Sequence, residues 1–184
     1  MIAQLAQPTY TPAEYLTLEE QAEQRHELIN GEMIPMAGGT TNHNEIITNL
    51  CVLLKPSVRR QNGKLYLENV KLWIPEPEVF TYPDVMVITE AVDYHGNTQT
   101  TVTNPSLIIE VLSPSTRNYD QGQKFEFYRS LSSLREYVLV DPERVYVMVY
   151  GQQGDGSWRL SILEDLAGEL VLDSLGVKLA IAEV

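Results

Sequence analysis

The chain has 184 residues, of which 43% are apolar and 21% are charged, a composition typical of a globular protein with a buried core. The net charge of −12 argues against a general electrostatic affinity for nucleic acid, although it fits a protein whose carboxylates gather around a cation. We expect a single domain over residues 1–184 and, without a run of about eighteen apolar residues, no membrane-spanning helix.

Cysteine usage and the first residues indicate a reducing environment. Cys51 is the only cysteine, so no internal disulfide can form and a cytoplasmic location is the default expectation. Residues 1–15 lack a charged segment followed by a long apolar stretch, and we therefore expect no signal peptide.

A capped helix is expected first. Thr11 can be the N-cap, Pro12 fits the first helical turn, and Glu14 completes a capping box, so a helix is predicted within residues 9–23.

A hairpin and a longer helix are expected next. Asn30-Gly31 supplies a favoured two-residue turn in the middle of residues 25–36. Apolar residues then recur at helical spacing over residues 42–61, a helix that Pro56 is expected to end or kink.

The central part of the chain is rich in strand patterns. Residues 64–74 alternate like one strand, and residues 84–89 form a second apolar strand. Residues 90–104 are polar and rich in turn residues, which predicts a loop or a connection at the sheet edge. The continuous apolar run of residues 106–112 is typical of a central strand buried on both faces.

The C-terminal third begins with a predicted helix of about three to four turns over residues 120–134. Two strands joined by a tight turn at Pro142-Glu143 follow, and three short strands or edges end the chain. The fold class is therefore α/β, a mixed central β-sheet flanked by helices. The strands after the helix are residues 136–141, 144–152, 158–163, 169–173 and 177–182.

Two acids stand out within the strand patterns. Glu110 lies inside the run "LIIEVL", and acidic side chains are almost never buried unless they are paired or bind a metal. Pro83 directly precedes Asp84, which places this acid at a strand start or bend. If the two strands are neighbours, both carboxylates meet at one end of the sheet, where a Mg²⁺ ion would relieve their repulsion.

The helix after the second acid supplies a cation. Lys124 and Tyr128 are four residues apart and share a face with Phe127 and Leu131, so Lys124 is predicted to point toward the core. A lysine in that position needs an anionic partner, and the carboxylates of the preceding strand are the nearest candidates. Glu27, beside an apolar pair, and His43, one turn before two isoleucines, are weaker candidates for the same site.

These motifs, in this order, resemble a known family. The segments "PDV", "IIEVLSPST", "DQGQKFEFYR" and "EYVLVDPE" are similar to those of the Uma-two family of restriction-endonuclease-like proteins, within the PD-(D/E)XK nuclease superfamily. The resemblance runs from "YTPAEYL" and "HELINGEM" through the strands after Asp141. It implies a restriction-endonuclease-like fold for the whole chain.

The resemblance also carries over individual residues. Asp84 matches the aspartate of the superfamily's PD motif, and Glu110 matches the second acid. The lysine expected two positions later is missing, because Leu112 stands there; in this family it is displaced to the following helix, which here gives Lys124.

Two upstream residues match as well. Glu27 matches the acid of the family's N-terminal "ELxxGE" stretch, and His43 matches the histidine that opens its second helix.

The activity that follows is metal-dependent hydrolysis of phosphodiester bonds, with DNA as the expected substrate. Asp84 and Glu110 would hold Mg²⁺ or Mn²⁺, together with the backbone carbonyl of Val111, and the ion would activate a water. Lys124 would orient that water or contact the phosphate. Glu27 would be an outer ligand of the metal.

Two further side chains would support the acids. His43 and Tyr128 are expected to contact the metal ligands and fix their orientation. A homodimer is expected, because a nuclease that cuts a duplex gains from two related sites facing the two strands.

Several alternatives stay open. The chain could be a catalytically impaired nuclease-fold protein that binds nucleic acid or a protein partner, which the acidic charge favours. It could be a hydrolase that uses two carboxylates without metal. Glu110 and Lys124 could also form a purely structural buried ion pair. Zinc is not expected, because one cysteine and three scattered histidines provide no ligand spacing.

Overall fold

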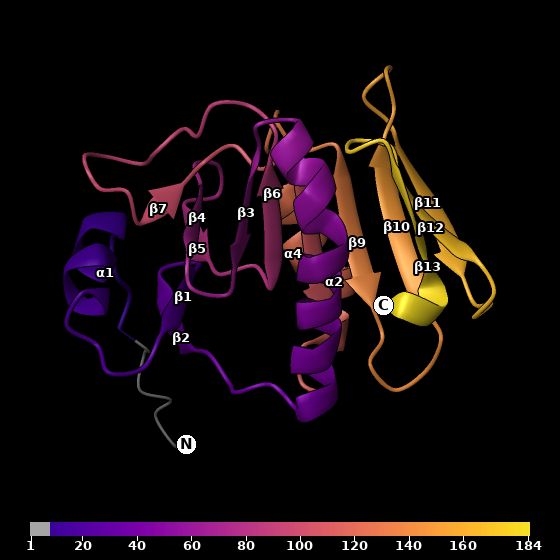
Figure 1. The fold of residues 1–184 in the computed structure, drawn as a ribbon. Coiled ribbons are helices and arrows are strands. Elements are labelled where there is room, and N and C mark those ends of the chain that lie inside the picture. Colours follow the sequence, from indigo (N-terminus) through magenta and orange to yellow (C-terminus); the bar gives the residue numbers. More distant parts are fainter. Residues whose placement is uncertain (1–7) are drawn as a thin grey trace.

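A computed structural model describes residues 8–184. We expect no signal peptide in residues 1–15, and the first seven of these residues lie outside the described part of the chain. Its helices and strands form two mixed sheets, a separate hairpin and helices that cover them (Figure 1). The helices are α1 (Pro12–Glu19), α2 (Thr41–Arg60), α3 (Arg117–Gln121) and α4 (Gln123–Tyr128), and a 3₁₀ turn lies at Ile181–Glu183.

The larger sheet has six strands in the order β11-β10-β9-β8-β6-β3. Its central strand β8 is buried along its whole length, as its continuous apolar pattern predicts, and it pairs parallel to β9 and antiparallel to β6. The strands of this sheet are β3 (Lys64–Leu67), β6 (Val85–Ile88), β8 (Leu107–Val111), β9 (Glu136–Val140), β10 (Val147–Gln152) and β11 (Trp158–Leu163).

The smaller sheet has five strands in the order β2-β1-β5-β4-β7, and it lies beside α1 at the N-terminal side of the molecule (Figure 1). The strand β5 has no counterpart in the sequence-based prediction. The strands are β1 (His26–Ile29), β2 (Glu32–Pro35), β4 (Lys71–Ile74), β5 (Val79–Thr81) and β7 (Thr101–Val102).

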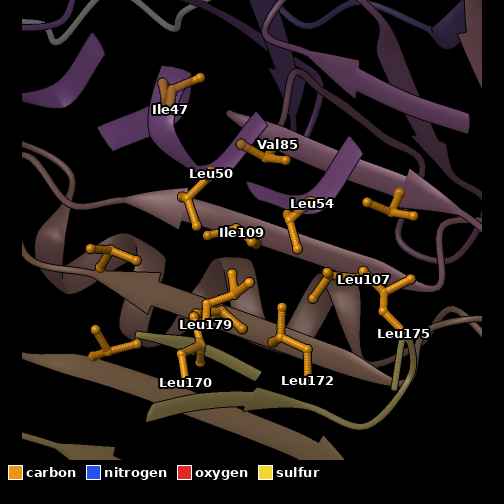
Figure 2. Packing of buried hydrophobic residues seen from close by; sticks show 14 of the residues in the cluster. Ile47, Leu50, Leu54, Val85, Leu107, Ile109, Leu170, Leu172, Leu175 and Leu179 are labelled. Atoms are coloured by element: carbon orange, nitrogen blue, oxygen red, sulfur yellow. The ribbon is translucent and has the colours of Figure 1, made fainter. Parts of the chain in front are cut away.

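One face of the large sheet is covered by α2 and by the hairpin of β12 (Glu169–Leu172) and β13 (Val177–Ala180). Figure 2 shows Leu50 and Leu54 of the helix above Ile109, with Leu170 and Leu179 of the hairpin approaching the same sheet. The opposite face packs against α4 and strands of the small sheet, so β8 lies between two apolar clusters.

The predicted N-terminal features are confirmed. Thr11 caps α1, and its backbone and hydroxyl both hydrogen-bond to the Glu14 carboxylate, which completes the capping box. The β1–β2 hairpin turns at Asn30 and Gly31, both of which have positive φ, as a tight two-residue turn requires.

Residues 64–74 are not one strand, which corrects the prediction. They form β3 and β4, which belong to different sheets, and the chain turns between them at Glu68 with a φ of 26°. Burial alternates along β4, whereas β3 is exposed at Lys64 and partly buried over its other residues, although the sequence pattern runs through both strands. Periodicity alone therefore could not reveal the change of sheet.

The helix predicted over residues 42–61 is confirmed as α2, although Pro56 does not end it. The helix continues to Arg60 because its last turn buries Ser57 and Val58, and this packing outweighs the lost hydrogen bond. The next helix prediction needs correction. The predicted helix over residues 120–134 starts earlier, breaks at Gly122 and ends at Tyr128.

Within residues 8–184, none of the helices combines the length and the apolar character that crossing a bilayer requires.

The packing of α2 makes a testable prediction about stability. Leu54 is completely buried, whereas Val52 on the same helix is 67% exposed. Leu54→Ala should lower the free energy of unfolding by about 2–5 kcal/mol, because it leaves a cavity against the sheet. Val52→Ala, the matched control, should change it by less than about 0.5 kcal/mol. Urea denaturation measures both, and equal effects would contradict this packing.

Candidate functional site

Asp84 and Glu110 lie side by side at one end of the large sheet. Val85 faces Ile109 in the β6–β8 ladder, which sets Asp84, directly before β6, opposite Glu110. The amide N–H of Asp84 is 3.4 Å from Glu110 Oε2, and the amide of Val111 donates to Asp84 Oδ2 at 2.7 Å. The Asp84 side chain is 15% exposed and that of Glu110 is 4% exposed, so solutes reach the pair from the Asp84 side.

Lys124 points inward from α4, as its spacing predicts, and meets three carboxylates. Its Nζ lies 2.9 Å from Glu110 Oε1, 3.6 Å from Asp120 Oδ1 and 3.7 Å from Glu27 Oε1. Asp120 was not among the sequence candidates, although its spacing of four residues from Lys124 would place the two on one face of the helix predicted over residues 120–134. The close contact between Glu110 and Lys124 that both the metal-site and the structural interpretation require is therefore present.

Hydroxyl groups tie the remaining acid into this cluster. The Tyr128 hydroxyl donates to Glu110 Oε1 at 2.6 Å and lies 3.3 Å from Thr81 Oγ1. The Thr81 hydroxyl in turn donates to Glu27 Oε1, which also accepts the backbone N–H of Tyr82 at 3.4 Å. Glu27 thus contacts Lys124 and Thr81, and Tyr128 orients Glu110.

His43 contacts Asp84 from the helix α2. It lies in the first turn of α2, where its backbone N–H donates to the N-cap hydroxyl of Thr40 at 3.2 Å. Its ring Nε2 is 3.1 Å from Asp84 Oδ2. The chain at Gly39 runs against this ring, since a Cβ at that position would lie 2.8 Å from His43 Nδ1.

Glu68 is a site residue that the sequence reasoning missed. A carboxylate oxygen of Glu68, one of Asp84 and a ring nitrogen of His43 all lie within 4.8 Å of one another. In the single strand predicted over residues 64–74, Glu68 lies in the middle and has no sequence feature that indicates a ligand. The turn between β3 and β4 brings it to Asp84 instead.

Burial and crowding of negative charge set the protonation of the cluster. Burial raises the pKa of Glu110 to about 8, with Asp84 and Asp120 adding to the rise and Lys124 opposing it. Burial disfavours the charge on Lys124, but the adjacent carboxylates of Glu110 and Glu27 outweigh it and hold its pKa well above the usual value. The hydrogen bond to Asp84 raises the pKa of His43.

Two arginines that follow β8 in the chain are engaged in ion pairs. Arg117 lies 2.7 Å from Asp141, and Arg129 forms an ion pair with Glu126 on the exposed face of α4. Lys71, at the start of β4, has its Nζ 5.8 Å from the centre of the Tyr82 ring.

The geometry suits a divalent cation. Carboxylates outnumber the ammonium group that they surround, since Lys124 lies near Glu27, Glu110 and Asp120. Oxygen donors of this kind are the ligands that Mg²⁺ prefers, and Asp84 leaves the pair accessible to water.

The chain matches one family model and two similar proteins. The model Uma2, described as "Putative restriction endonuclease", matches residues 12–182. An uncharacterised protein of Synechocystis sp. (strain PCC 6803) is 45% identical over 159 residues, which covers 86% of this chain and 88% of the relative. A second uncharacterised Synechocystis protein is 34% identical over 174 residues, which covers 95% and 90% respectively.

A solved structure shares the fold. It is the crystal structure of a "putative nuclease belonging to DUF820" from Anabaena variabilis ATCC 29413, with a TM-score of 0.78 and 20% sequence identity. The superposition covers 94% of this chain and 96% of that chain, so the mixed α/β fold extends over almost the full length of both.

The connection that follows β8 is held by Asp141, whose side chain is 1% exposed and accepts from Arg117 at 2.7 Å and from Arg144 at 3.0 Å. The hydrogen bond from Arg117 is the main reason that the pKa of Asp141 falls from 3.8 to about 2. When a carboxyl has a lower pKa in the folded protein than in the unfolded chain, its ionised form stabilises the fold at pH values above the unfolded pKa. This stabilisation is lost as the pH falls toward the folded pKa.

We therefore expect Asp141→Asn to lower the free energy of unfolding by about 2 kcal/mol at pH 7. The difference from wild type should shrink between about pH 4 and pH 2, which denaturation at several pH values measures. Glu126→Gln, which removes an exposed ion pair, is the control and should have little effect. A pH-independent loss in Asp141→Asn would contradict the ionic origin of the stabilisation.

Proposed function

Because this chain belongs to the Uma2 family, we propose that it is a divalent-metal-dependent endonuclease that hydrolyses phosphodiester bonds of DNA. The observation that carries the proposal is the pairing of β6 with β8, which sets the Asp84 and Glu110 carboxylates next to each other at a solvent-accessible sheet end.

Asp84 and Glu110 would hold Mg²⁺ or Mn²⁺ in this proposal. The backbone carbonyl of Val111 is a third donor, because the N–H and C=O of a strand residue face the same side and the Val111 N–H points to Asp84. When bound, the cation would supply Lewis-acid chemistry, since it lowers the pKa of water and offsets charge that develops on the phosphate.

The surrounding side chains would position these ligands and the substrate. Tyr128 keeps Glu110 oriented through its 2.6 Å hydrogen bond. Lys124 stays protonated between the acids, where its charge can stabilise a phosphate oxygen. Glu27, held by Thr81, limits how far the Lys124 ammonium can move and can accept a hydrogen bond from an ordered water.

DNA must approach a chain with a net charge of −12, so local cations matter. Arg25 Cζ and Lys71 Nζ lie 5.9 and 5.8 Å from the centre of the Tyr82 ring, and Arg25 donates to the Glu68 carbonyl at 2.6 Å. We propose that these two side chains contact the phosphate backbone beside the acids.

A second candidate function is supported by one contact. Glu110 Oε1 already bonds to both Lys124 and Tyr128, an arrangement that would persist in a nuclease fold without activity. Such a protein would act as a binding module for nucleic acid or for another protein, and retention of binding without metal-dependent cleavage would identify it.

We also propose a homodimer in a reducing, cytoplasmic setting. Cys51 is a free thiol, and β11 leaves one edge of the large sheet unpaired within residues 8–184. Light scattering at micromolar protein should give twice the chain mass of 20.8 kDa. A monomer would contradict this part of the proposal.

Cleavage of plasmid or oligonucleotide DNA with Mg²⁺ or Mn²⁺ tests the main proposal. Asp84→Asn and Glu110→Gln should each reduce the cleavage rate by roughly a hundredfold or more, because each removes a charged ligand. Glu126→Gln changes a carboxylate on the exposed face of α4 and should leave the rate unchanged. Wild-type cleavage that survives chelation by EDTA, or that the two site variants retain, would refute the assignment.

The raised pKa of Glu110 makes a separate prediction about metal binding. With a pKa of about 8, Glu110 is largely protonated at neutral pH, and a cation has to displace this proton. The apparent Mg²⁺ affinity should therefore rise up to about tenfold per pH unit from pH 6 and level off above pH 8. Calorimetric titration over this range measures it. An equally steep rise in Glu110→Gln would mean that another group titrates.

A further inference from the structure

A second group of potential ligands adjoins the acid pair on the side away from Lys124. It consists of His43 in the first turn of α2, Glu68 after β3 and Asp84 before β6. Donor atoms of the three side chains lie within 4.8 Å of one another, and His43 Nε2 is 3.1 Å from Asp84 Oδ2. Two ligands bound at about 2.2 Å to one cation lie at most about 4.4 Å apart, so only a small contraction is needed.

The backbone holds these side chains together. The Glu68 N–H donates to the Asp84 carbonyl at 3.3 Å, which continues the β3–β6 ladder by one residue beyond its last pair. The Glu68 carbonyl accepts from Arg25 Nη1 at 2.6 Å, so both of its backbone groups are engaged. The three candidate ligands therefore approach one point from separate elements that are fixed by hydrogen bonds.

The donor set differs from that of the acid pair. One imidazole nitrogen and two carboxylates suit a first-row transition-metal cation, whereas Mg²⁺ is held almost entirely by oxygen. We infer that His43, Glu68 and Asp84 form a second cation position that takes Mn²⁺ or a similar ion, with Asp84 shared between it and Glu110. Neighbouring cations that share a carboxylate are a known arrangement for phosphodiester cleavage.

The role of this position in cleavage rests on the proposed function, but cation binding itself does not. Binding is therefore tested directly, with Mn²⁺ as the probe and without nucleic acid. Electron paramagnetic resonance counts the bound Mn²⁺, and electron spin-echo modulation detects a nitrogen ligand, which only the histidine position would supply.

Wild-type protein should bind Mn²⁺ with a nitrogen coupling. His43→Gln should lose the coupling, and Glu68→Gln should weaken the coupled ion at least about tenfold. Glu78→Gln is the matched control for Glu68, because Glu78 is also a glutamate with positive φ but lies in the turn between β4 and β5. Glu110→Gln should retain the nitrogen-coupled ion.

A positioning variant provides a test that keeps every ligand. Gly39→Ala would place a methyl group against the His43 ring and turn it away from Asp84, so the nitrogen-coupled ion should weaken. Gly38→Ala is its control, because a Cβ at Gly38 meets no atom within 4 Å. Circular dichroism establishes that each variant is folded.

The possible failures are distinguishable. Wild-type protein without a nitrogen coupling, or a coupling that persists in His43→Gln, would overturn the second position and leave the proposed nuclease intact. A coupled Mn²⁺ ion in a protein that cleaves no DNA would overturn the nuclease and leave the cation position.

Discussion

The antiparallel pairing of β6 with β8 is the constraint on which the rest of the site depends. It sets Asp84 opposite Glu110, and a slip of one residue would turn one of the two carboxylates to the other face of the sheet. The register is secured because both strands are buried on both faces, between α2 and the β12–β13 hairpin on one side and α4 on the other. The packing of helices and of the hairpin on β6 and β8 thus fixes the distance between the two carboxylates.

Charge balance explains the groups around this pair. Lys124 is the single ammonium that contacts Glu27, Glu110 and Asp120 within the described part of the chain, so negative charge exceeds positive charge in a buried place. Burial, together with the nearby Asp84 and Asp120 carboxylates, raises the pKa of Glu110 to about 8, so this carboxyl holds a proton more readily than an exposed glutamate does. A bound cation would replace that proton, and it would also stabilise the folded state, because the unfolded chain does not hold the ligands together.

The sequence was informative wherever a pattern of neighbouring residues predicts the structure. The Thr11 capping box, the Asn30-Gly31 turn and the buried central strand around Glu110 are each visible in a few consecutive residues, and so is the inward face of Lys124. Long-range packing decided the rest. Whether the chain changes sheets at Glu68 depends on which strands accept β3 and β4, and no property of residues 64–74 records it.

The residues of the candidate centre come from segments that are far apart in the chain. Glu27 belongs to β1 and Lys124 to α4, and β8 completes its pairing only when β9 lies parallel to it. Contacts of such long sequence separation form late, because the loops that they close must be ordered first. The centre is therefore complete only when the segments from β1 to β9 have packed together, which ties the arrangement of its side chains to the folding of both sheets.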